Sequence, residues 1–270
     1  MKLITPWLLT WCCVFTTSAY QLSFPVSPVS TGLGGCHTAC PGSTAPAGRV
    51  ESTVRLSANA AAHNSYGVPE LSHLQAGLYY KTPPVVIGLT AQHFGFGGYG
   101  ETAVGLDVGR KFSPHWSAAL RGWWVRVAWP TDEKPVHTGL LEAEVLVHPH
   151  QRLTLGLHVF NLSFTRYRVR DGKLFLPVHF RLGVCYRFSG QWALSVEGEK
   201  ELYGPPGVHA GCQYAVARRV ELRLGLEARS GISPTGGIGV RFKHFQCDLG
   251  IQYHWKLGVQ SSVGIQYLWP

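Results

Sequence analysis

The chain has 270 residues and a formal net charge of +9 at pH 7; 14% of its residues are charged, 12% are aromatic and 32 are glycine. Charged residues make up about a quarter of an ordinary soluble domain, so a surface hydrated on every side is disfavoured and part of it is expected to face lipid. Lys and Arg are scattered along the sequence rather than clustered in one run. This scatter disfavours a nucleic-acid-binding protein.

The first 19 residues are predicted to form a signal peptide that is cleaved off. Lys2 supplies a positive charge, Trp7 to Phe15 form an apolar stretch, and Thr17 to Ala19 offer a small-residue cleavage site. The apolar stretch is about half the roughly 20 residues that a spanning helix needs. A membrane anchor is the alternative, and a lipidated Cys12 or Cys13 is disfavoured by the bulky neighbouring Trp11.

The cysteines outside this segment do not indicate a disulfide framework. Their number is odd and their spacing is wide: Cys36, Cys40, Cys185, Cys212 and Cys247. Cys36 and Cys40 could form a bridge, or bind a metal together with His37, but a second pair of ligands at metal-site spacing is missing. We therefore expect no metal site and no cofactor.

Hydrophobic residues alternate with polar ones along most of the remaining chain. Val220 to Ala228 is the clearest case, with Val, Leu, Leu, Leu and Ala on one face and Glu, Arg, Gly and Glu on the other. A helix would mix these two sets, whereas a strand separates them. The same pattern recurs over residues 141–147, 179–188, 208–216 and 245–255, and it weakens over residues 116–129. There the apolar face changes sides near Trp123 and Trp124, which predicts a β-bulge.

These strands predict an all-β, transmembrane, antiparallel up-and-down β-barrel of about 14 strands. Each strand covers about 10 to 12 residues, which suits a tilted bilayer crossing. Turns alternate between short and long ones, the long set including Phe96 to Gly100, and the first strand is expected at Glu51 to Ala61. After residue 20 no stretch has the length of a spanning helix, which excludes a helical membrane protein. A soluble secreted β-rich protein is the lesser alternative.

Two details favour the membrane barrel over the soluble one. Aromatic residues lie near strand ends, where an interfacial girdle would be, as with Tyr186, Phe188, Trp255, Tyr267 and Trp269. Glycine recurs on the polar face, which suits a crowded lumen or contact with another backbone segment; the examples are Gly183, Gly211, Gly225, Gly250 and Gly264.

In such a barrel the charged residues of the polar faces point into the lumen. The predicted lumen-lining residues are Glu142, Glu144, Arg181, Arg187, Glu197, Glu199, Arg223, Glu227, Arg241 and Asp248. They could form a charged constriction that selects solutes, or an internal salt-bridge network that fills the barrel. Since both signs are mixed along adjacent strands, we favour the network.

Catalysis is not expected. The sequence contains no GxSxG nucleophile elbow, and Ser72 next to His73 is a candidate pair by proximity in the sequence alone. We therefore predict a protein that is not an enzyme.

The last strand resembles the β-signal that the bacterial outer-membrane assembly machinery recognises. Ser262, Gly264, Tyr267 and Trp269 occupy its polar, glycine and aromatic places, and the chain departs from the usual version because Pro270 follows the last aromatic residue. The resemblance implies that these four residues are an assembly signal. It also implies outer-membrane lipids and the assembly machinery as partners.

A second resemblance covers most of the chain after the signal peptide. The stretch GLGGCHTACPGSTAPAGR from Gly32 to Arg49 resembles the N-terminal region of FadL/PorV-type barrels, and Gly237 to Tyr267 is similar to the last strands of Bacteroidetes members of that group. Ala45 stands where the family has Asn. The resemblance implies an N-terminal plug-like segment over residues 20–49, tucked into the lumen of a barrel over residues 50–270.

The family implies a location in the outer membrane of a Gram-negative bacterium and two possible roles. One is a channel or carrier for small or hydrophobic solutes. The alternative is a scaffold barrel of the type IX secretion system, with secretion-system proteins as partners.

Overall fold

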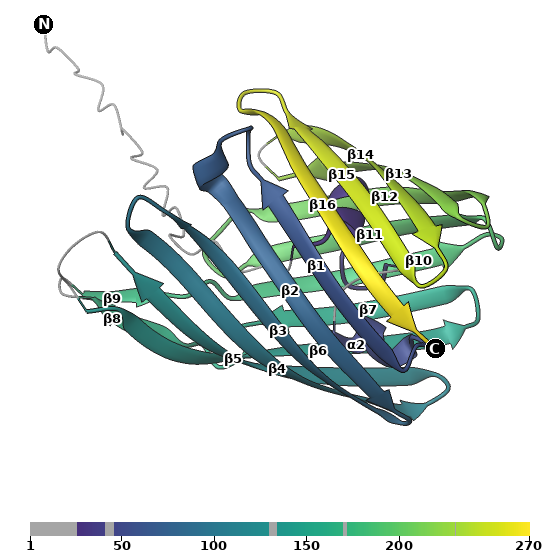
Figure 1. Ribbon diagram of the computed structural model, residues 1–270, viewed down its shortest axis with the longest axis horizontal. Helices are drawn as coiled ribbons and strands as arrows, with labels where there is room; N and C mark the ends of the chain where they lie inside the picture. The colour runs from purple at the N-terminus through teal and green to yellow at the C-terminus, as the bar shows by residue number, and fades with distance from the viewer. Residues whose placement is uncertain (1–25, 41–45, 130–133, 170–171, 230) are drawn as a thin grey trace, which may run out of the picture.

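The chain forms one closed β-barrel of fourteen antiparallel strands, with a separate two-stranded sheet beside it. The structure is a computed structural model that describes residues 26–40, 46–129, 134–169, 172–229 and 231–270. The predicted signal peptide lies outside the described residues. Two short helices precede the first strand and lie inside the barrel (Figure 1).

The elements follow one another along the chain with short connections. The helices are α1 (Pro28–Gly32), α2 (Pro46–Glu51) and the single 3₁₀ turn η1 (Pro69–Leu71). The barrel strands are β1 (Leu56–Asn64), β2 (Ser72–Thr82), β3 (Val85–Phe96), β4 (Tyr99–Ser113), β5 (Trp116–Ala128), β6 (Val136–His150), β7 (Leu153–Phe160), β10 (His179–Arg187), β11 (Trp192–Glu201), β12 (Pro206–Ala217), β13 (Val220–Ala228), β14 (Ile232–Phe242), β15 (Phe245–His254) and β16 (Gly258–Trp269). The separate sheet consists of β8 (Arg166–Val169) and β9 (Gly172–Phe175).

Each barrel strand pairs with its neighbours in the sequence, and the last strand closes the barrel on the first. The closing pair runs in register from Leu56 opposite Trp269 to Asn64 opposite Ser261. A closed barrel leaves no strand edge with unpaired backbone groups, which is what a sheet inside a bilayer requires. The predicted up-and-down barrel of about 14 strands is confirmed.

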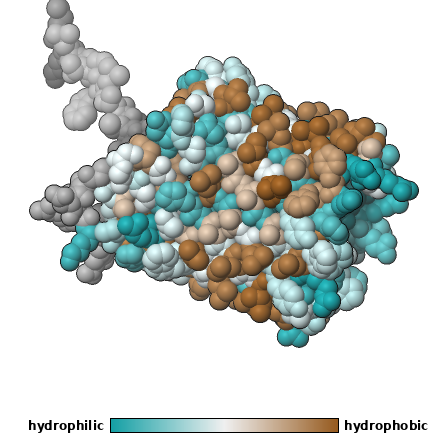
Figure 2. Space-filling view, viewed as in Figure 1, coloured by the Kyte–Doolittle hydropathy of each residue, from teal (hydrophilic) through white to brown (hydrophobic). Residues whose placement is uncertain are grey.

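The two faces of each strand have opposite character, with the apolar one outside. In β13, Arg223 faces the lumen with 2% of its surface exposed, and the next residue, Leu224, faces outward and is 69% exposed. This order is the reverse of a soluble barrel and suits a wall surrounded by lipid. Figure 2 shows hydrophobic residues spread over the wall and hydrophilic ones gathered at its right-hand edge.

The barrel has two different ends, which we name by their connections. At the hairpin end the connections are short turns at residues 83–84, 114–115, 151–152, 188–191, 218–219 and 243–244, and β1 starts and β16 finishes there. At the loop end the connections are residues 65–71, 97–98, 129–135, 161–178, 202–205, 229–231 and 255–257. The long connection predicted at Phe96 to Gly100 is wrong: Gly97 and Gly98, both at positive φ, make a two-residue turn.

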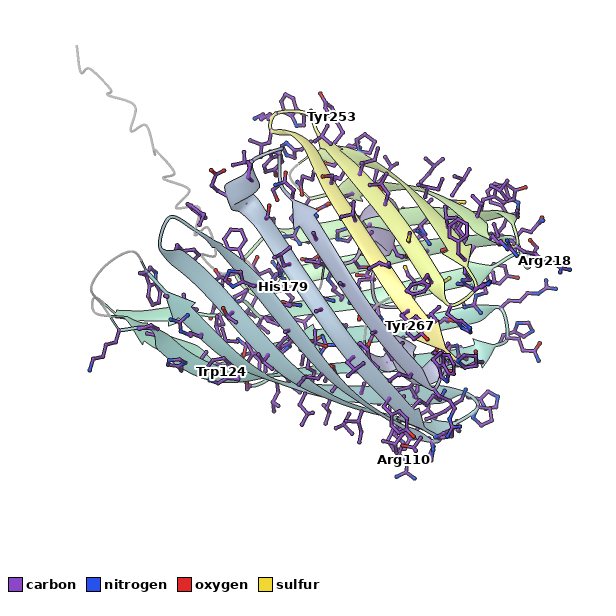
Figure 3. All side chains as sticks on the ribbon, in the orientation of Figure 1. Arg110, Trp124, His179, Arg218, Tyr253 and Tyr267 are labelled. Carbon is purple, nitrogen blue, oxygen red and sulfur yellow. The ribbon has the colours of Figure 1, made fainter. Side chains whose placement is uncertain are left out.

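Aromatic side chains gather outside the wall near both ends. At the hairpin end Phe112 stacks on Trp116 and Trp192 stacks on Tyr214, each pair with ring centroids 4.2 Å apart. Figure 3 shows Tyr253 at the loop end and Tyr267 near the hairpin end, both on the outside of the wall. Such belts are typical of proteins that cross a membrane.

The bulge predicted at Trp123 and Trp124 is absent from β5, which pairs with β6 without a shift from Trp116 to Val127. The two indoles point to opposite faces, with Trp123 5% exposed in the lumen and Trp124 47% exposed on the outside. The alternation weakens in the sequence because the lumen face is itself apolar here, with Trp123, Val125 and Val127 buried inside the barrel.

The first barrel strand begins later than predicted, at Leu56 instead of Glu51. Residues 46–51 form α2 instead, where Pro46 supplies the fixed φ that suits a first helical turn. The exact limits of the predicted domains stay a prediction. In the described residues, no helix is both long and apolar enough to cross a membrane.

Candidate functional site: the plugged lumen

The described residues of the N-terminal segment, 26–40 and 46–51, lie inside the barrel and are called the plug here. Its first helix, α1, packs against β13 to β16, and its second helix, α2, packs against β3 to β6. Figure 1 shows both helices within the ring of strands. The plug therefore crosses the lumen from one side of the wall to the other.

Glycines on the lumen face give the plug its seat. A Cβ atom on Gly225 would lie 2.3 Å from the backbone nitrogen of Gly34, and one on Gly250 would lie 2.4 Å from the carbonyl oxygen of Pro28. Both distances are far below van der Waals contact, so any side chain at either position would push the plug away. Gly183 and Gly211 also lie against the plug backbone, a role that the glycine pattern in the sequence suggests, whereas Gly264 lies against the side chain of Pro28.

Charged lumen residues hold the plug by its backbone. The Glu197 carboxylate accepts hydrogen bonds from the backbone N–H groups of His37 and Thr38, at 2.9 and 2.7 Å. Arg181 donates from Nη1 to the carbonyl oxygen of Gly35 at 3.1 Å. A charge-assisted hydrogen bond is roughly twice as strong as a neutral one, so Glu197 and Arg181 form the strongest described grip on the plug.

Further contacts fix the rest of the plug. Glu144 accepts a hydrogen bond from the backbone N–H of Ala47 at 2.8 Å, and Gln75 accepts one from that of Val26 at 2.8 Å. Thr235 accepts from the backbone N–H of Gly34 at 2.9 Å. These contacts come from strands on three sides of the lumen, so the wall surrounds the plug.

His37 lies in the middle of the plug and is buried. Burial lowers its pKa to about 3, an effect to which the neighbouring His158 adds. The two imidazole rings meet edge to face with centroids 5.9 Å apart. His37 is therefore neutral at physiological pH.

A first salt-bridge network lies where the middle of the plug meets β10 to β12. Arg181 pairs with Glu197 at 2.8 Å and with Glu199 at 2.7 Å. Glu199 also contacts His209 at 3.1 Å, and Arg229 donates to it. Both carboxylates and Arg181 are buried, so each charge depends on the others for its stability.

A second network lies across β4 to β7. Arg121 pairs with Asp107 and, at 3.4 Å, with Glu142. Glu142 also accepts from the Trp123 indole N–H at 2.6 Å and lies 2.8 Å from His158 Nε2. The charged groups and the imidazole of this network are 2% exposed or less, so both carboxylates are neutralised by buried partners.

A third network joins β13 to β15. Arg223 donates to Glu221 and to Asp248, each at 2.7 Å. Gln246 also donates to Asp248, at 3.0 Å. The network fills the part of the lumen between α1 and the hairpin end.

Most of the ten predicted lumen-lining residues therefore belong to ion pairs or hold the plug. Glu227 is half-buried and accepts a hydrogen bond from Gln252. Arg187 and Arg241 are exposed, because they lie where the lumen opens at the hairpin end. Among the buried polar residues that the predicted set lacks are Asp107, Arg121, His158 and His209, which all belong to the ion-pair networks. The first two follow the alternation of β4 and β5, but the supposed bulge hid the face of β5.

The described residues of the lumen line two cavities that lie on either side of the plug. The loop-end cavity, of about 760 Å³, is lined by plug residues together with Arg181, Glu199, His209, Glu227 and Arg229. The hairpin-end cavity, of about 380 Å³, is lined by Arg49, Glu51, His148, Arg187 and Arg241, among others. Both lie in the size range of small-molecule sites.

An apolar cluster lies inside the barrel beside the loop-end cavity. It consists of Phe94, Ala103, Trp123, Val125, Val127, Leu140, Phe160 and Leu176, and the half-buried Leu71 packs on it. Phe94 and Leu71 also line the cavity. The loop-end cavity therefore combines ionic groups on one side with an apolar wall on the other.

The four residues of the predicted assembly signal all lie on β16. Ser262 and Gly264 lie on the lumen face, where Ser262 is buried and Gly264 is half-buried. Trp269 is exposed on the outer face, and the Tyr267 ring contacts it. Their part in assembly stays a prediction.

The candidate chemical groups of the sequence do not converge. Ser72 and His73 are consecutive on β2 and point to opposite faces. Among the described residues, no group of three His, Cys, Asp or Glu side chains could hold a metal ion, and Cys36 and Cys40 are free thiols.

The fold and the lumen define a class of protein: a plugged, closed barrel of fourteen strands with an apolar outer wall. Solved structures of this shape include the CymD monoaromatic hydrocarbon channel, at 12% identity and a TM-score of 0.68 over 90% of this chain and 97% of that one. A Pseudomonas aeruginosa FadL homologue matches with 11% identity and a TM-score of 0.68 over 92% and 99%.

The Pseudomonas putida toluene transporter TodX matches with 9% identity and a TM-score of 0.59, over 89% of this chain and 96% of that one. At these identities the similarity establishes the fold, which is that of FadL-type outer-membrane barrels. No protein-family model matches the sequence, and no curated protein matches it.

Proposed function

We propose that this protein is an outer-membrane channel or carrier for small apolar solutes in a Gram-negative bacterium. The observation that carries the proposal is the loop-end cavity of about 760 Å³ that shares Phe94 and Leu71 with an apolar cluster inside the barrel. An apolar wall next to a cavity offers an apolar solute a surface to bind, which the ionic networks of the lumen do not. The similar fold of proteins named as hydrocarbon channels supports the same role.

The solute is proposed to enter at the loop end and to bind first against this apolar wall. Burying apolar surface contributes about 25 cal/mol per Å², so a small hydrocarbon gains affinity from the cluster alone. The ionic networks on the other side hold the plug in place. Passage then requires the plug to move, because the described part of it lies between the two cavities.

Uptake by intact cells tests the proposal, since apolar solutes cross plain phospholipid bilayers without help and a liposome assay would not resolve them. The chain is expressed in a Gram-negative strain that lacks its own hydrocarbon channels, and the initial uptake of labelled toluene is compared with that of a labelled sugar. We expect the protein to raise toluene uptake severalfold. Equal uptake with and without the protein would contradict the channel.

A matched pair of variants links uptake to the cavity. Leu71→Gln adds a polar group to the apolar wall and is expected to lower toluene uptake. Leu224→Gln is the control, because it makes the same substitution on the outer face of β13, outside the lumen. Both variants are first checked for the shift in gel mobility on boiling that a folded barrel shows.

Insertion into the outer membrane is tested at the predicted assembly signal. Trp269→Asp places a charge on the outer face at the hairpin end, and we expect less protein in the outer-membrane fraction. Normal membrane levels of the variant would contradict the role of this strand as a signal. The type IX secretion scaffold stays a prediction, because no contact or cavity among the described residues favours it over a channel.

A further inference from the structure

The hairpin-end cavity has a chemical character that the channel proposal does not use. Its lining includes three arginines, Arg49 from the plug, Arg187 from β10 and Arg241 from β14. We propose that this cavity binds the oxyanion group, a carboxylate or a phosphate, of a small ligand. Arg is the side chain best suited to such groups, because its planar fork donates two parallel hydrogen bonds to them.

The charges that line this cavity do not cancel. Glu51 is the one acidic residue among them, against three arginines. Its carboxylate is already engaged, by Lys111 at 2.8 Å and by His148 at 3.7 Å. The loop-end cavity, in contrast, has Arg181 and Arg229 against Glu199 and Glu227. Of these two linings, as far as the described residues make them up, the hairpin-end one carries the excess of positive charge.

Arg49 is the cation that most needs a counter-ion. Only 7% of its surface is exposed, and its guanidinium lies over the Tyr79 ring at 4.7 Å. Its Nε and Nη2 atoms have no hydrogen-bond partner among the described residues, and no described carboxylate lies within 4.0 Å. The neighbouring residues 41–45 carry no acidic side chain either. Both Arg49 atoms are shielded from the cavity, so an anion there would act on Arg49 through its charge rather than through a hydrogen bond. A buried cation without a partner is costly, and such an anion would offset part of that cost.

The two wall arginines are free to close on a ligand. Arg187 ends β10 at the opening of the lumen and makes no side-chain hydrogen bond with a described residue. Arg241 donates from Nε and Nη2 to the side-chain oxygen of Gln246, at 3.3 and 2.8 Å, which leaves other donors available. The charges come from two strands and the plug, so they surround the cavity rather than line one side of it.

The remaining lining limits the size of the ligand. Cys40, Val54, Leu146 and Leu268 give the cavity an apolar part. A short chain with one oxyanion group therefore fits its chemistry, and butyrate serves as a probe of that class.

Calorimetric titration of the full-length protein in a non-ionic detergent tests the site. Butyrate and inorganic phosphate are the anionic probes, and 1-butanol is the neutral control of matched size. We expect saturable binding of at least one anion and none of 1-butanol. The measurement is made at equilibrium in detergent and does not require passage across a membrane. Its result therefore tests the anion site separately from the proposed channel.

Arg187→Gln and Arg241→Gln are the decisive variants, because both residues are exposed and their loss should not prevent folding. Each is expected to weaken anion binding about tenfold, since a hydrogen bond to a charged group contributes about 1.5–3 kcal/mol, or tenfold per 1.4 kcal/mol. Arg218→Gln is the matched control: this exposed arginine lies on a hairpin-end turn outside the cavity (Figure 3). It should change the affinity by about twofold at most, as expected for a distant, screened charge.

Three results would overturn the proposal: no saturable binding of either anion, equal binding of butyrate and 1-butanol, or unchanged affinity in both arginine variants. A competition then separates two sources of the anion. Displacement of the probe by phosphatidylglycerol would assign the site to a lipid headgroup, and its retention would assign it to a ligand from the aqueous phase.

Discussion

The two cavities of the lumen are built from similar residues, yet their charges are used differently. At the loop end every arginine of the lining meets a carboxylate: Arg181 pairs with Glu197 and Glu199, and Arg229 donates to Glu199. At the hairpin end Arg49 and Arg187 meet none among the described residues.

The difference shows where the barrel uses its polar residues for structure. On the loop side of the plug, the ionic groups hold plug backbone and one another, and the apolar cluster fills the rest. On the hairpin side, cations remain without partners at the opening of the lumen. Buried ion pairs support the plug, whereas unpaired charges are available to a ligand.

The largest effect is expected from breaking the loop-side network at Glu197. Glu197→Ala removes two hydrogen bonds to the plug backbone and leaves Arg181 with one carboxylate fewer. Removing one partner of a buried pair costs about 3–5 kcal/mol. We expect that loss in the free energy of unfolding in lipid vesicles, measured with urea, and trypsin cleavage at Arg49 once the plug leaves its seat.

Glu227→Gln is the control for this variant, because Glu227 is half-buried and accepts a hydrogen bond from Gln252 rather than from the plug. It should leave Arg49 protected from trypsin. Protection that persists in Glu197→Ala would mean that the glycine seat alone retains the plug.

A smaller effect is expected from altering the seat itself. Gly225→Ala places a Cβ atom 2.3 Å from the backbone nitrogen of Gly34, so the plug backbone must move away from β13. Overpacking typically costs about 1–3 kcal/mol. Gly236→Ala is the matched control on the adjacent strand, since its Cβ would meet no atom closer than 3.9 Å. Equal unfolding free energies for the two variants would show that the plug adjusts without strain.

Much of the barrel could be predicted because alternation is a local property. The predicted alternating segment from Val220 to Ala228 coincides with β13, and the apolar face lies outside as expected. The error at Trp123 has a physical origin: the pattern assumes a polar lumen, and β5 contributes an apolar lumen face. From the sequence alone, a switch of the apolar residues to the other face of the strand cannot be distinguished from a lumen face that is itself apolar.

The pairings of the site could not be predicted, since they depend on register and on the plug. Glu197 lies next to His37 and Thr38 only because the plug folds back across the lumen, more than a hundred residues away in the sequence. Alternation predicts a lumen-facing side for Arg187 and Arg241, but their position at the opening follows from where β10 and β14 end.

The smallest effect is expected from replacing Glu51, and this substitution tests the difference in charge between the two cavities. Burial alone would raise the pKa of its carboxyl, but the hydrogen bond from Lys111 and the nearby Ser117 hydroxyl lower it below its ordinary value. A carboxyl whose pKa is depressed in the folded state stabilises the protein above its unfolded pKa of about 4.3 and loses that contribution as the pH falls through the folded value.

Glu51→Gln should therefore lower the free energy of unfolding at pH 7 by about 0.2–1 kcal/mol, as is usual for a partly exposed ion pair. The difference from the wild type should shrink as the solution is acidified below the folded pKa; a difference that persists would assign Glu51 a role in packing. Because the substitution removes the one acidic group that lines the hairpin-end cavity, the same protein should bind butyrate more tightly than the wild type at pH 7.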